Sequence, residues 1–406
     1  MTQDKNRRII KGNVLVRGDT IESVGRESDK SGRVIDASGS IVMPGLINMH
    51  SHVGMAPLRG RLTGTADLGE FLAETSRFDS RNGKELLEAS SLIGIVEMLR
   101  TGTTAFLDLY YSEDIVARNA KMAGIRANLA WVILDKEYTT QKGVPLKNAE
   151  DFVRRYTGEE LVRPMFGLQG VYVCSEETIG RTMELSDKYD TNVHMHLSET
   201  RKEVDDNMKK HGMPPVEYLW NRGFLSKRMI AAHCVWLEER EMTAMAESGA
   251  TAVYNPVSNM KLGSGKANIM GMLQKKINIT IGTDSVASND SLDIFGTMKS
   301  GALESGVTPQ MMLDFASVNA AKALGTNSGS IEQGKKADII VVDGKSAGMV
   351  PTLAENAVSN LVYSACGRDV SLCIVDGNII MRDGTLVGRE LSRAYEKSLE
   401  RITGFA

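Results

Sequence analysis

The sequence predicts an α/β protein, a (β/α)8 barrel with a small β-sandwich formed by the two ends of the chain. Three observations lead to this prediction. Short apolar runs alternate with helical patterns through the middle of the chain, and both ends carry alternating strand patterns. Histidines and an aspartate stand where strands of the middle region end. The 406 residues are enough for such a barrel with additional segments.

Residues 1–45 are expected to supply the N-terminal part of the sandwich. Apolar and polar residues alternate there between glycines, as in half-buried strands, over 10–16, 20–24, 33–35 and 40–42. The first eight residues are polar and charged, so no segment typical of a signal peptide is visible.

Residues 46–330 are expected to form the barrel. Runs that are apolar throughout are typical of parallel strands, which helices cover on the outer face. Helical patterns such as 84–100, 175–189 and 237–248 separate these runs. The eight predicted strands cover 46–52, 103–109, 126–133, 165–171, 191–197, 228–233, 250–255 and 278–284.

Residues 331–406 are expected to complete the sandwich and to end in a helix. The run 337–343 has the pattern of a buried strand. Strand patterns over 371–375 and 379–381 flank an Asp-Gly turn and predict a hairpin. The last element, 389–402, is an amphipathic helix.

The composition restricts the possible partners and setting. A hydrophobic content of 42% and a charged content of 24% are ordinary for a soluble globular protein. The net charge of −3 argues against nucleic acid or an anionic membrane as partner. No apolar run approaches the ~20 residues of a membrane span. The four cysteines have no paired spacing, which favours a reducing, cytoplasmic setting.

Two His-x-His motifs predict a metal centre. The chain has six histidines, and the motifs hold four of them, His50 with His52 and His194 with His196. Side chains two apart on a strand point the same way, so His50 and His52 can reach one ion. Asp284 ends the eighth predicted strand. Imidazole and carboxylate suit a borderline divalent metal, and barrel enzymes carry their chemistry at the carboxyl ends of strands.

We therefore expect one divalent ion, zinc with iron as the alternative, held by His50, His52, His196 and Asp284. A bound ion of this kind makes hydroxide available near neutral pH. Asp284 can accept the proton of the attacking water. His194 has the right spacing too, but the spacing alone does not make it a ligand.

Two more residues near these ligands suit catalysis. His233 ends the sixth predicted strand and can orient the hydroxide or an oxyanion. Glu199 follows His196 by three residues and can shuttle a proton to the substrate. Taken singly, a strand-end histidine is often a core residue and a glutamate an ordinary surface residue. Together with Asp284 and the two His-x-His motifs, they predict a hydrolase.

One other motif fails on inspection. Gly263-Ser264-Gly265-Lys266 is similar to part of a phosphate-binding loop. Met260 replaces its leading glycine and Ala267 its serine or threonine, so we do not expect a nucleotide phosphate there.

Five motifs, in order along the chain, resemble the amidohydrolase superfamily and its deaminase and chlorohydrolase branch. The resemblance implies that His50, His52, His196 and Asp284 are metal ligands and that Glu199, His233 and Asp284 form the catalytic group. The position that matches His194 is not reliably a ligand in related deaminases, so we expect His194 one layer deeper in the barrel. The motifs are Pro-Gly-Leu-Ile-Asn-x-His-Ser-His-x-x-Met-x-x-x-Arg-Gly (44–60), His-Leu-Ser-Glu-Thr (196–200), Ala-His-Cys-Val (232–235), Asn-Pro-x-Ser-Asn-x-Lys-Leu-Gly (255–263) and Gly-Thr-Asp-Ser-x-Ala-Ser-Asn (282–289).

Departures from the family narrow the subtype. Binuclear members carry a lysine at the end of the fourth strand, and 164–170 has none, so one metal is implied. Gln169 stands where adenosine-type deaminases have a histidine that contacts substrate, and Asp79 where they have a ribose-binding glutamate. The arginines of the loop after the third strand are absent, with Trp131 and Pro145 near their places.

The function expected from the resemblance is hydrolytic release of ammonia from a purine-type ring amine. The substrate would be a 5′-modified adenosine of the methylthioadenosine, 5′-deoxyadenosine and S-adenosylhomocysteine class, bound by Glu199, His233, Gln169 and Asp79. Without the arginines, a neutral 5′ tail is expected to be preferred over a carboxylate. We also expect a homo-oligomer.

Three alternatives remain at this point. The chain could be a triazine-type chlorohydrolase or aminohydrolase, or a guanine or cytosine deaminase. A third alternative, of another class, is a catalytically silent barrel that serves as a binding scaffold. Glu199 favours deamination, because an amine leaving group needs a proton and chloride does not.

Overall fold

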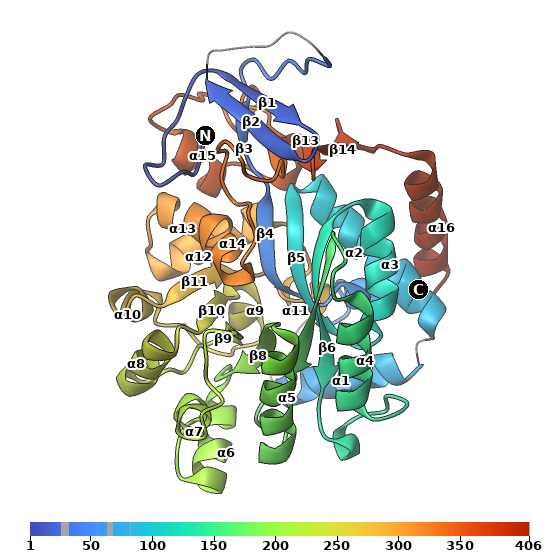
Figure 1. Ribbon diagram of the computed structural model, residues 1–406, viewed down its shortest axis with the longest axis vertical. Coiled ribbons are helices and arrows are strands. Elements are labelled where there is room, and N and C mark those ends of the chain that lie inside the picture. Colours follow the sequence, from blue (N-terminus) through green and yellow to red (C-terminus); the bar gives the residue numbers. More distant parts are fainter. Residues whose placement is uncertain (26–31, 63–67, 82, 406) are drawn as a thin grey trace.

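Eight parallel strands form a barrel, and helices lie around it (Figure 1). The computed structural model describes residues 1–25, 32–62, 68–81 and 83–405. The order of the strands in the sheet is their order in the chain. They are β4 (Leu46–Ser51), β5 (Thr103–Tyr110), β6 (Arg126–Ile133), β7 (Val162–Leu168), β8 (Val193–Leu197), β9 (Met229–His233), β10 (Thr251–Tyr254) and β11 (Asn278–Ile281).

The sheet closes where β4 meets the segment that follows β11. Ser51 and Asp284 form a parallel bridge, and the N–H of Asp284 donates to the carbonyl of His50 at 2.9 Å. Gly282 allows this approach, because a Cβ there would lie 2.7 Å from the backbone nitrogen of His50. Closure of the barrel thus brings Asp284 beside His50.

The predicted barrel is confirmed, and the largest shifts in strand ends, of three residues, are in the fourth and eighth strands. All eight apolar runs are strands because most of their side chains are buried in the interior or beneath the surrounding helices. The fourth strand, predicted over 165–171, is β7 and ends at Leu168, so Gln169 lies just beyond it. The eighth ends at Ile281, three residues before Asp284.

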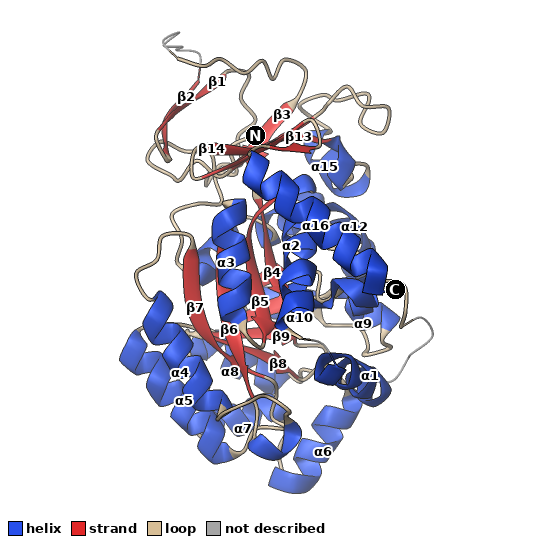
Figure 2. Ribbon diagram, turned by 90° about the vertical axis from the view of Figure 1, so that its right-hand side faces the viewer, coloured by secondary structure: helices blue, strands red, loops and turns tan. Residues whose placement is uncertain are grey.

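The helices that connect the strands surround the barrel (Figure 2). The predicted helices 84–100, 175–189 and 237–248 are α2, α5 and α8. The Ser175 side chain caps α5 by accepting the N–H of Thr178. The helices of the first half are α1 (Leu68–Arg81), α2 (Lys84–Arg100), α3 (Glu113–Ala123), α4 (Pro145–Tyr156), α5 (Glu176–Tyr189), α6 (Arg201–His211) and α7 (Pro215–Asn221).

Shorter helices dominate the second half of the barrel. They are α8 (Glu239–Ser248), α9 (Pro256–Lys261), α10 (Ile269–Gln274), α11 (Val286–Asn289), α12 (Ile294–Ser305), α13 (Pro309–Phe315) and α14 (Val318–Leu324). Near the C-terminus follow α15 (Ala357–Tyr363) and α16 (Arg389–Phe405), and 3-10 turns occur as η1 (Val53–Leu58), η2 (Lys136–Tyr138) and η3 (Gly367–Asp369). Helix α16 is the predicted terminal helix and packs against α2.

The two ends of the chain form the predicted sandwich at one end of the barrel (Figure 2). Buried Ile21 packs with Ile331 and Ile339 in a core to which both sheets contribute. One sheet pairs β1 (Asn13–Arg17) with β2 (Thr20–Gly25). The other has the order β15 (Thr385–Leu386), β14 (Asn378–Arg382), β13 (Val370–Val375), β12 (Ile339–Val342) and β3 (Ile41–Pro44).

Most strand predictions in the sandwich are confirmed, and one is wrong. Asp376 and Gly377 both have positive φ, 52° and 75°, as the predicted Asp-Gly hairpin turn requires. Residues 33–35, predicted as a strand, form none. Val34 is 78% exposed and has no apolar surface to cover, and the Asp36 carboxylate accepts the N–H of Ser38, which starts a turn.

A cluster of ion pairs ties the sandwich to the amino-terminal ends of the barrel strands. Arg126, the first residue of β6, places Nε 2.7 Å from Asp338 Oδ2 and also contacts Asp376. Lys336 Nζ lies 3.1 Å from Asp376 Oδ1. The sandwich therefore sits at the end of the barrel opposite the predicted metal ligands.

Candidate active site

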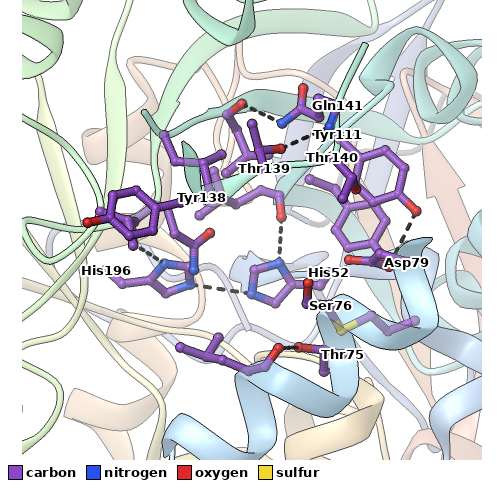
Figure 3. Close-up of a pocket in the computed structure, with 18 of the residues that line it drawn as sticks. His52, Thr75, Ser76, Asp79, Tyr111, Tyr138, Thr139, Thr140, Gln141 and His196 are labelled. Carbon is purple, nitrogen blue, oxygen red and sulfur yellow. Dashed lines mark hydrogen bonds between the residues drawn. The ribbon is translucent and has the colours of Figure 1, made fainter. Parts of the chain in front are cut away.

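A cavity of about 680 Å³ opens at the carboxyl ends of the barrel strands. His50, fully buried, lies beneath it. Figure 3 shows His52 and His196 on its floor, with Asp79 and Tyr138 on different sides. The predicted site residues that line the cavity are Asp79, His52, Gln169, His196, Glu199, His233 and Asp284.

Hydrogen bonds fix the proton of His50 on the nitrogen that faces away from the cavity. His194 Nδ1 donates to the carbonyl of Ile230 at 2.8 Å, so its Nε2 carries a lone pair. That nitrogen accepts from His50 Nδ1 at 2.8 Å, which leaves His50 Nε2 without a proton. Burial lowers the pKa of His194 to about 3 and keeps that of His50 well below its usual value. His194 thus lies one layer beneath His50 and holds its ring.

His52 and His196 have the same arrangement. His52 Nδ1 donates to the carbonyl of Leu109, and His196 Nδ1 donates to the carbonyl of Gln169 at 2.8 Å. Their Nε2 atoms lie 3.4 Å apart. When the rings are neutral, as a metal ligand must be, His50, His52 and His196 each direct a lone pair to a common point. Burial alone would lower the pKa of His52, but Asp284 raises it.

Asp284 adds a carboxylate to the three nitrogens. Its Oδ1 lies 3.5 Å from His50 Nε2 and 3.3 Å from His52 Nε2. Ser258 Oγ donates to the other oxygen, Oδ2, at 2.6 Å. Burial would raise the pKa of Asp284, but the neighbouring rings of His52, His50 and His233 hold it well below its usual value. The carboxylate is therefore ionised.

This donor set fits a divalent metal ion of the zinc type. The ligand atoms of His50, His52 and His196 lie within 4.8 Å of one another, as do those of His50, His233 and Asp284. The Nε2 of His50 is buried and has no hydrogen-bond partner among the described residues. A buried nitrogen without a partner costs free energy, and a cation at this point would remove that cost.

Glu199 and His233 lie together beside the donor set, both nearly fully buried. Glu199 Oε1 accepts from Ser264 Oγ at 3.0 Å, and its Oε2 lies 3.7 Å from His233 Nε2. The other nitrogen of His233 is 2.9 Å from Asn259 Oδ1. Burial raises the pKa of Glu199, which favours its protonated form relative to an exposed glutamate, as a proton donor requires.

The backbone at the mouth of the barrel is strained. Ser198, His233, Cys234 and Asp284 have left-handed φ values of 51°, 72°, 49° and 64°. Such conformations are unfavourable for residues other than glycine and are common at functional sites. The Glu203 carboxylate accepts the N–H groups of Ser198 and Glu199, at 3.0 and 2.8 Å, and thereby fixes the turn after β8.

The sequence did not reveal three polar side chains that hold the site. Ser258, Asn259 and Ser264 contact Asp284, His233 and Glu199 respectively. All three lie in or next to the Asn-Pro-x-Ser-Asn-x-Lys-Leu-Gly segment. The serine rejected as part of a phosphate loop is the one that donates to Glu199.

The outer part of the cavity contains Asp79, Gln169 and two lysines. Asp79 on α1 contacts the hydroxyls of two tyrosines, and Gln169 Nε2 donates to Tyr172 Oη at 3.3 Å. Lys84 and Lys142 line the cavity, and none of its described lining residues is an arginine. Trp131 lines it too, whereas Pro145 is the first residue of α4.

Sequence comparisons place the chain among known hydrolases. A model of the amidohydrolase family matches residues 41–380. A 5′-deoxyadenosine deaminase from Methanothermobacter thermautotrophicus is 37% identical, over 93% of this chain and 91% of the relative. A 5-methylthioadenosine/S-adenosylhomocysteine deaminase from Caldicellulosiruptor saccharolyticus is 35% identical, over 99% of this chain and 96% of the relative.

Solved structures share the fold. A zinc-bound adenosine deaminase from Xanthomonas campestris superposes with a TM-score of 0.87, at 28% identity over 96% of this chain and 93% of the other. An atrazine chlorohydrolase from Arthrobacter aurescens TC1, complexed with zinc, gives a TM-score of 0.89 at 22% identity, over 99% and 97%. At that identity the second similarity concerns the fold alone.

In the described part of the chain, no helix combines the length and apolar character that a bilayer crossing requires.

Proposed function

The chain belongs to the amidohydrolase family, and we propose that it is a hydrolytic deaminase that releases ammonia from the purine ring of a 5′-modified adenosine. The names of the relatives, 5′-deoxyadenosine deaminase and 5-methylthioadenosine/S-adenosylhomocysteine deaminase, support this substrate class. One observation carries the reaction type. Three imidazole nitrogens and a carboxylate converge beside a buried glutamate on the floor of a cavity.

The metal is proposed to be one zinc ion, with Fe²⁺ as the alternative, held by His50, His52, His196 and Asp284. When bound there, the ion would make hydroxide available near neutral pH. Strand β7, Val162–Leu168, has no lysine, which supports a single ion. His233 is not included among these ligands, because its Nε2 faces Glu199.

The side chains then divide the proton transfers among them. Asp284 is ionised and can accept the proton of the attacking water. His233 donates from Nδ1 to Asn259, so its Nε2 can accept a hydrogen bond from the attacking water or hydroxide and orient it. Glu199 has a raised pKa and can deliver a proton to the ring and to the departing amine. Because ammonia is a poor leaving group without that proton, Glu199 favours deamination over loss of chloride.

The sugar and the 5′ tail are proposed to occupy the outer cavity. Asp79 is a candidate acceptor of hydrogen bonds from sugar hydroxyls. Gln169 is a candidate for an uncharged hydrogen bond to the substrate, because its amide can donate and accept. Lys84 and Lys142 are point charges, without the paired donors of an arginine that bind a carboxylate on both oxygens. We therefore expect methylthioadenosine to have a higher kcat/KM than S-adenosylhomocysteine at equal metal loading. A clear preference for S-adenosylhomocysteine would reject this charge argument.

Ammonia release from a panel of purine, pyrimidine and triazine amines tests the proposed function. Turnover of 5′-deoxyadenosine, methylthioadenosine or adenosine would support it. Activity confined to guanine, cytosine or a triazine would reject the substrate class in favour of those alternatives. Stoichiometric metal without any turnover would support a silent binding scaffold. The homo-oligomer and the cytoplasmic setting stay predictions, which light scattering and cell fractionation can test.

A further inference from the structure

Two tyrosine hydroxyls contact the same oxygen of Asp79. Tyr110 is the last residue of β5 and Tyr111 follows it, and their rings stack with centroids 4.5 Å apart. The Tyr110 hydroxyl contacts Asp79 Oδ1 closely, and the Tyr111 hydroxyl contacts it at 3.3 Å. Figure 3 shows Asp79 and Tyr111 next to each other on one wall of the cavity.

Both tyrosines act as donors in this cluster. A carboxylate can only accept hydrogen bonds, so each hydroxyl must point its hydrogen at Oδ1. Burial raises the pKa of Tyr110 and of Tyr111, so both hydroxyls keep their protons. Burial also raises the pKa of Asp79 to about 6, against the opposing effect of the two hydroxyls. At neutral pH the carboxylate is therefore mainly ionised.

The second oxygen of Asp79, Oδ2, differs from Oδ1 in its hydrogen bonds. An oxygen of a carboxylate has two lone pairs, and the two tyrosines use both on Oδ1. Among the residues that the structure describes, none donates to Oδ2. Asp79 lines the cavity, so this acceptor is available to a molecule bound there.

We propose that Tyr110 and Tyr111 are positioning residues that leave Asp79 a single free oxygen, so that the enzyme binds its sugar through one hydroxyl and not through the vicinal pair. The inference rests on the proposed function, in which a nucleoside occupies the cavity. A carboxylate with both oxygens free can accept both hydroxyls of a vicinal diol. Here the second hydroxyl would meet an oxygen whose lone pairs are already used.

The test compares kcat/KM for adenosine, 2′-deoxyadenosine and 3′-deoxyadenosine in the metal-loaded enzyme. Loss of a hydrogen bond to a charged group corresponds to about 10–100-fold. We expect a loss of that size for one deoxynucleoside and less than about threefold for the other. Equal losses for both would overturn the proposal, because they would mean that both hydroxyls are bound. Equal turnover of all three would also overturn it, because Asp79 would then bind no sugar hydroxyl.

The Tyr111→Phe variant tests the role of the tyrosine directly. Removing its hydroxyl frees one lone pair on Oδ1, so the hydroxyl that was silent in the wild type should now contribute. Its removal from the substrate should cost about tenfold in the variant, in KM and not in kcat. An unchanged ratio between the two deoxynucleosides would overturn the proposal.

A matched control removes a tyrosine–carboxylate bond elsewhere. The Tyr189 hydroxyl lies 2.9 Å from Glu150 Oε1, outside the cavity, so Tyr189→Phe should reproduce the wild-type ratio. A changed ratio in this control would overturn the assignment to Asp79. Absence of turnover on every adenosine derivative would reject the proposed function itself. That outcome differs from normal turnover with equal hydroxyl costs, which rejects the one-oxygen inference alone.

Discussion

At each of the three histidines proposed as ligands, the proton lies on the nitrogen turned away from the centre. His50 donates to His194, His52 to the carbonyl of Leu109, and His196 to the carbonyl of Gln169. These acceptors lie on other strands or just beyond them, so the His-x-His spacing could predict the ligands but not what orients them. Partners of this kind fix the ring and its tautomer and thereby support metal affinity.

Replacing His194 tests this support. In His194→Phe, the Nδ1 proton of His50 loses its acceptor, so the ring loses its orientation. Loss of such a partner typically lowers metal affinity or activity about 10–100-fold. Competition with a chelator measures the zinc affinity. The control is His211→Phe, because His211 stacks on Tyr218 away from the cavity. Unchanged affinity in His194→Phe would mean that His50 needs no acceptor on Nδ1.

Glu199→Gln separates proton transfer from metal binding. The amide has the size of the carboxyl group but cannot carry the proton, so ammonia release should fall about 10²–10⁴-fold. Metal content should not change, because Glu199 contacts Ser264 and faces His233. Glu184→Gln on the exposed face of α5 is the control. A rate near that of the wild type would remove Glu199 from the mechanism.

At the scale of elements, the sequence predicted the barrel strands, which bury most of their side chains. Each barrel run is apolar because both of its faces are covered, and all eight predictions were confirmed. The prediction over 33–35 was wrong because alternation alone does not show whether a neighbouring strand is present, and Val34 is 78% exposed. Strand ends were less certain, as the three-residue shift of β7 shows.

The candidate site could be predicted in part, because the barrel prediction also says which strand ends lie together. Carboxyl ends of parallel strands meet at one face, so residues at strand ends come together whatever their separation in the sequence. What the pattern could not show is how far Asp284 lies from His50. That distance depends on the closure between β4 and the segment after β11, where a Cβ on residue 282 would lie 2.7 Å from the backbone nitrogen of His50.

The Gly282→Ala variant tests whether the close approach of residue 282 to β4 keeps Asp284 near the histidines. A Cβ at this position would meet Asn255 Oδ1 and the backbone nitrogen of His50, each at 2.7 Å, so Asp284 should move away from the histidines. We expect metal content well below one ion per chain and a lower unfolding temperature. Gly296→Ala is the control, because its Cβ would meet nothing within 4 Å in α12. Full metal occupancy in Gly282→Ala would show that the closure can widen without loss of the site.

At the scale of the whole molecule, the candidate site and the sandwich lie at opposite ends of the barrel. The ion cluster of Arg126, Asp338, Asp376 and Lys336 holds the sandwich at the amino-terminal ends of the strands. Arg126 and Asp338 have side-chain exposures of 11% and 3%, so this pair is buried. The ion cluster and the candidate site therefore share no residues.

Arg126→Met tests that separation. Removing one partner of a buried ion pair leaves the other charge without compensation, which typically destabilises a protein by about 3–5 kcal/mol. The unfolding temperature should fall by several degrees, whereas kcat/KM of the folded enzyme should stay within about twofold. Arg181→Met is the control, because its pair with Glu184 is exposed on both sides and such pairs contribute about 0–1 kcal/mol. Adding Asp338→Asn should recover part of the loss, because it removes the buried charge that Arg126 left unpaired. If kcat/KM fell in parallel with stability at temperatures where the variant is fully folded, the sandwich would have to influence the geometry at the far end of the barrel.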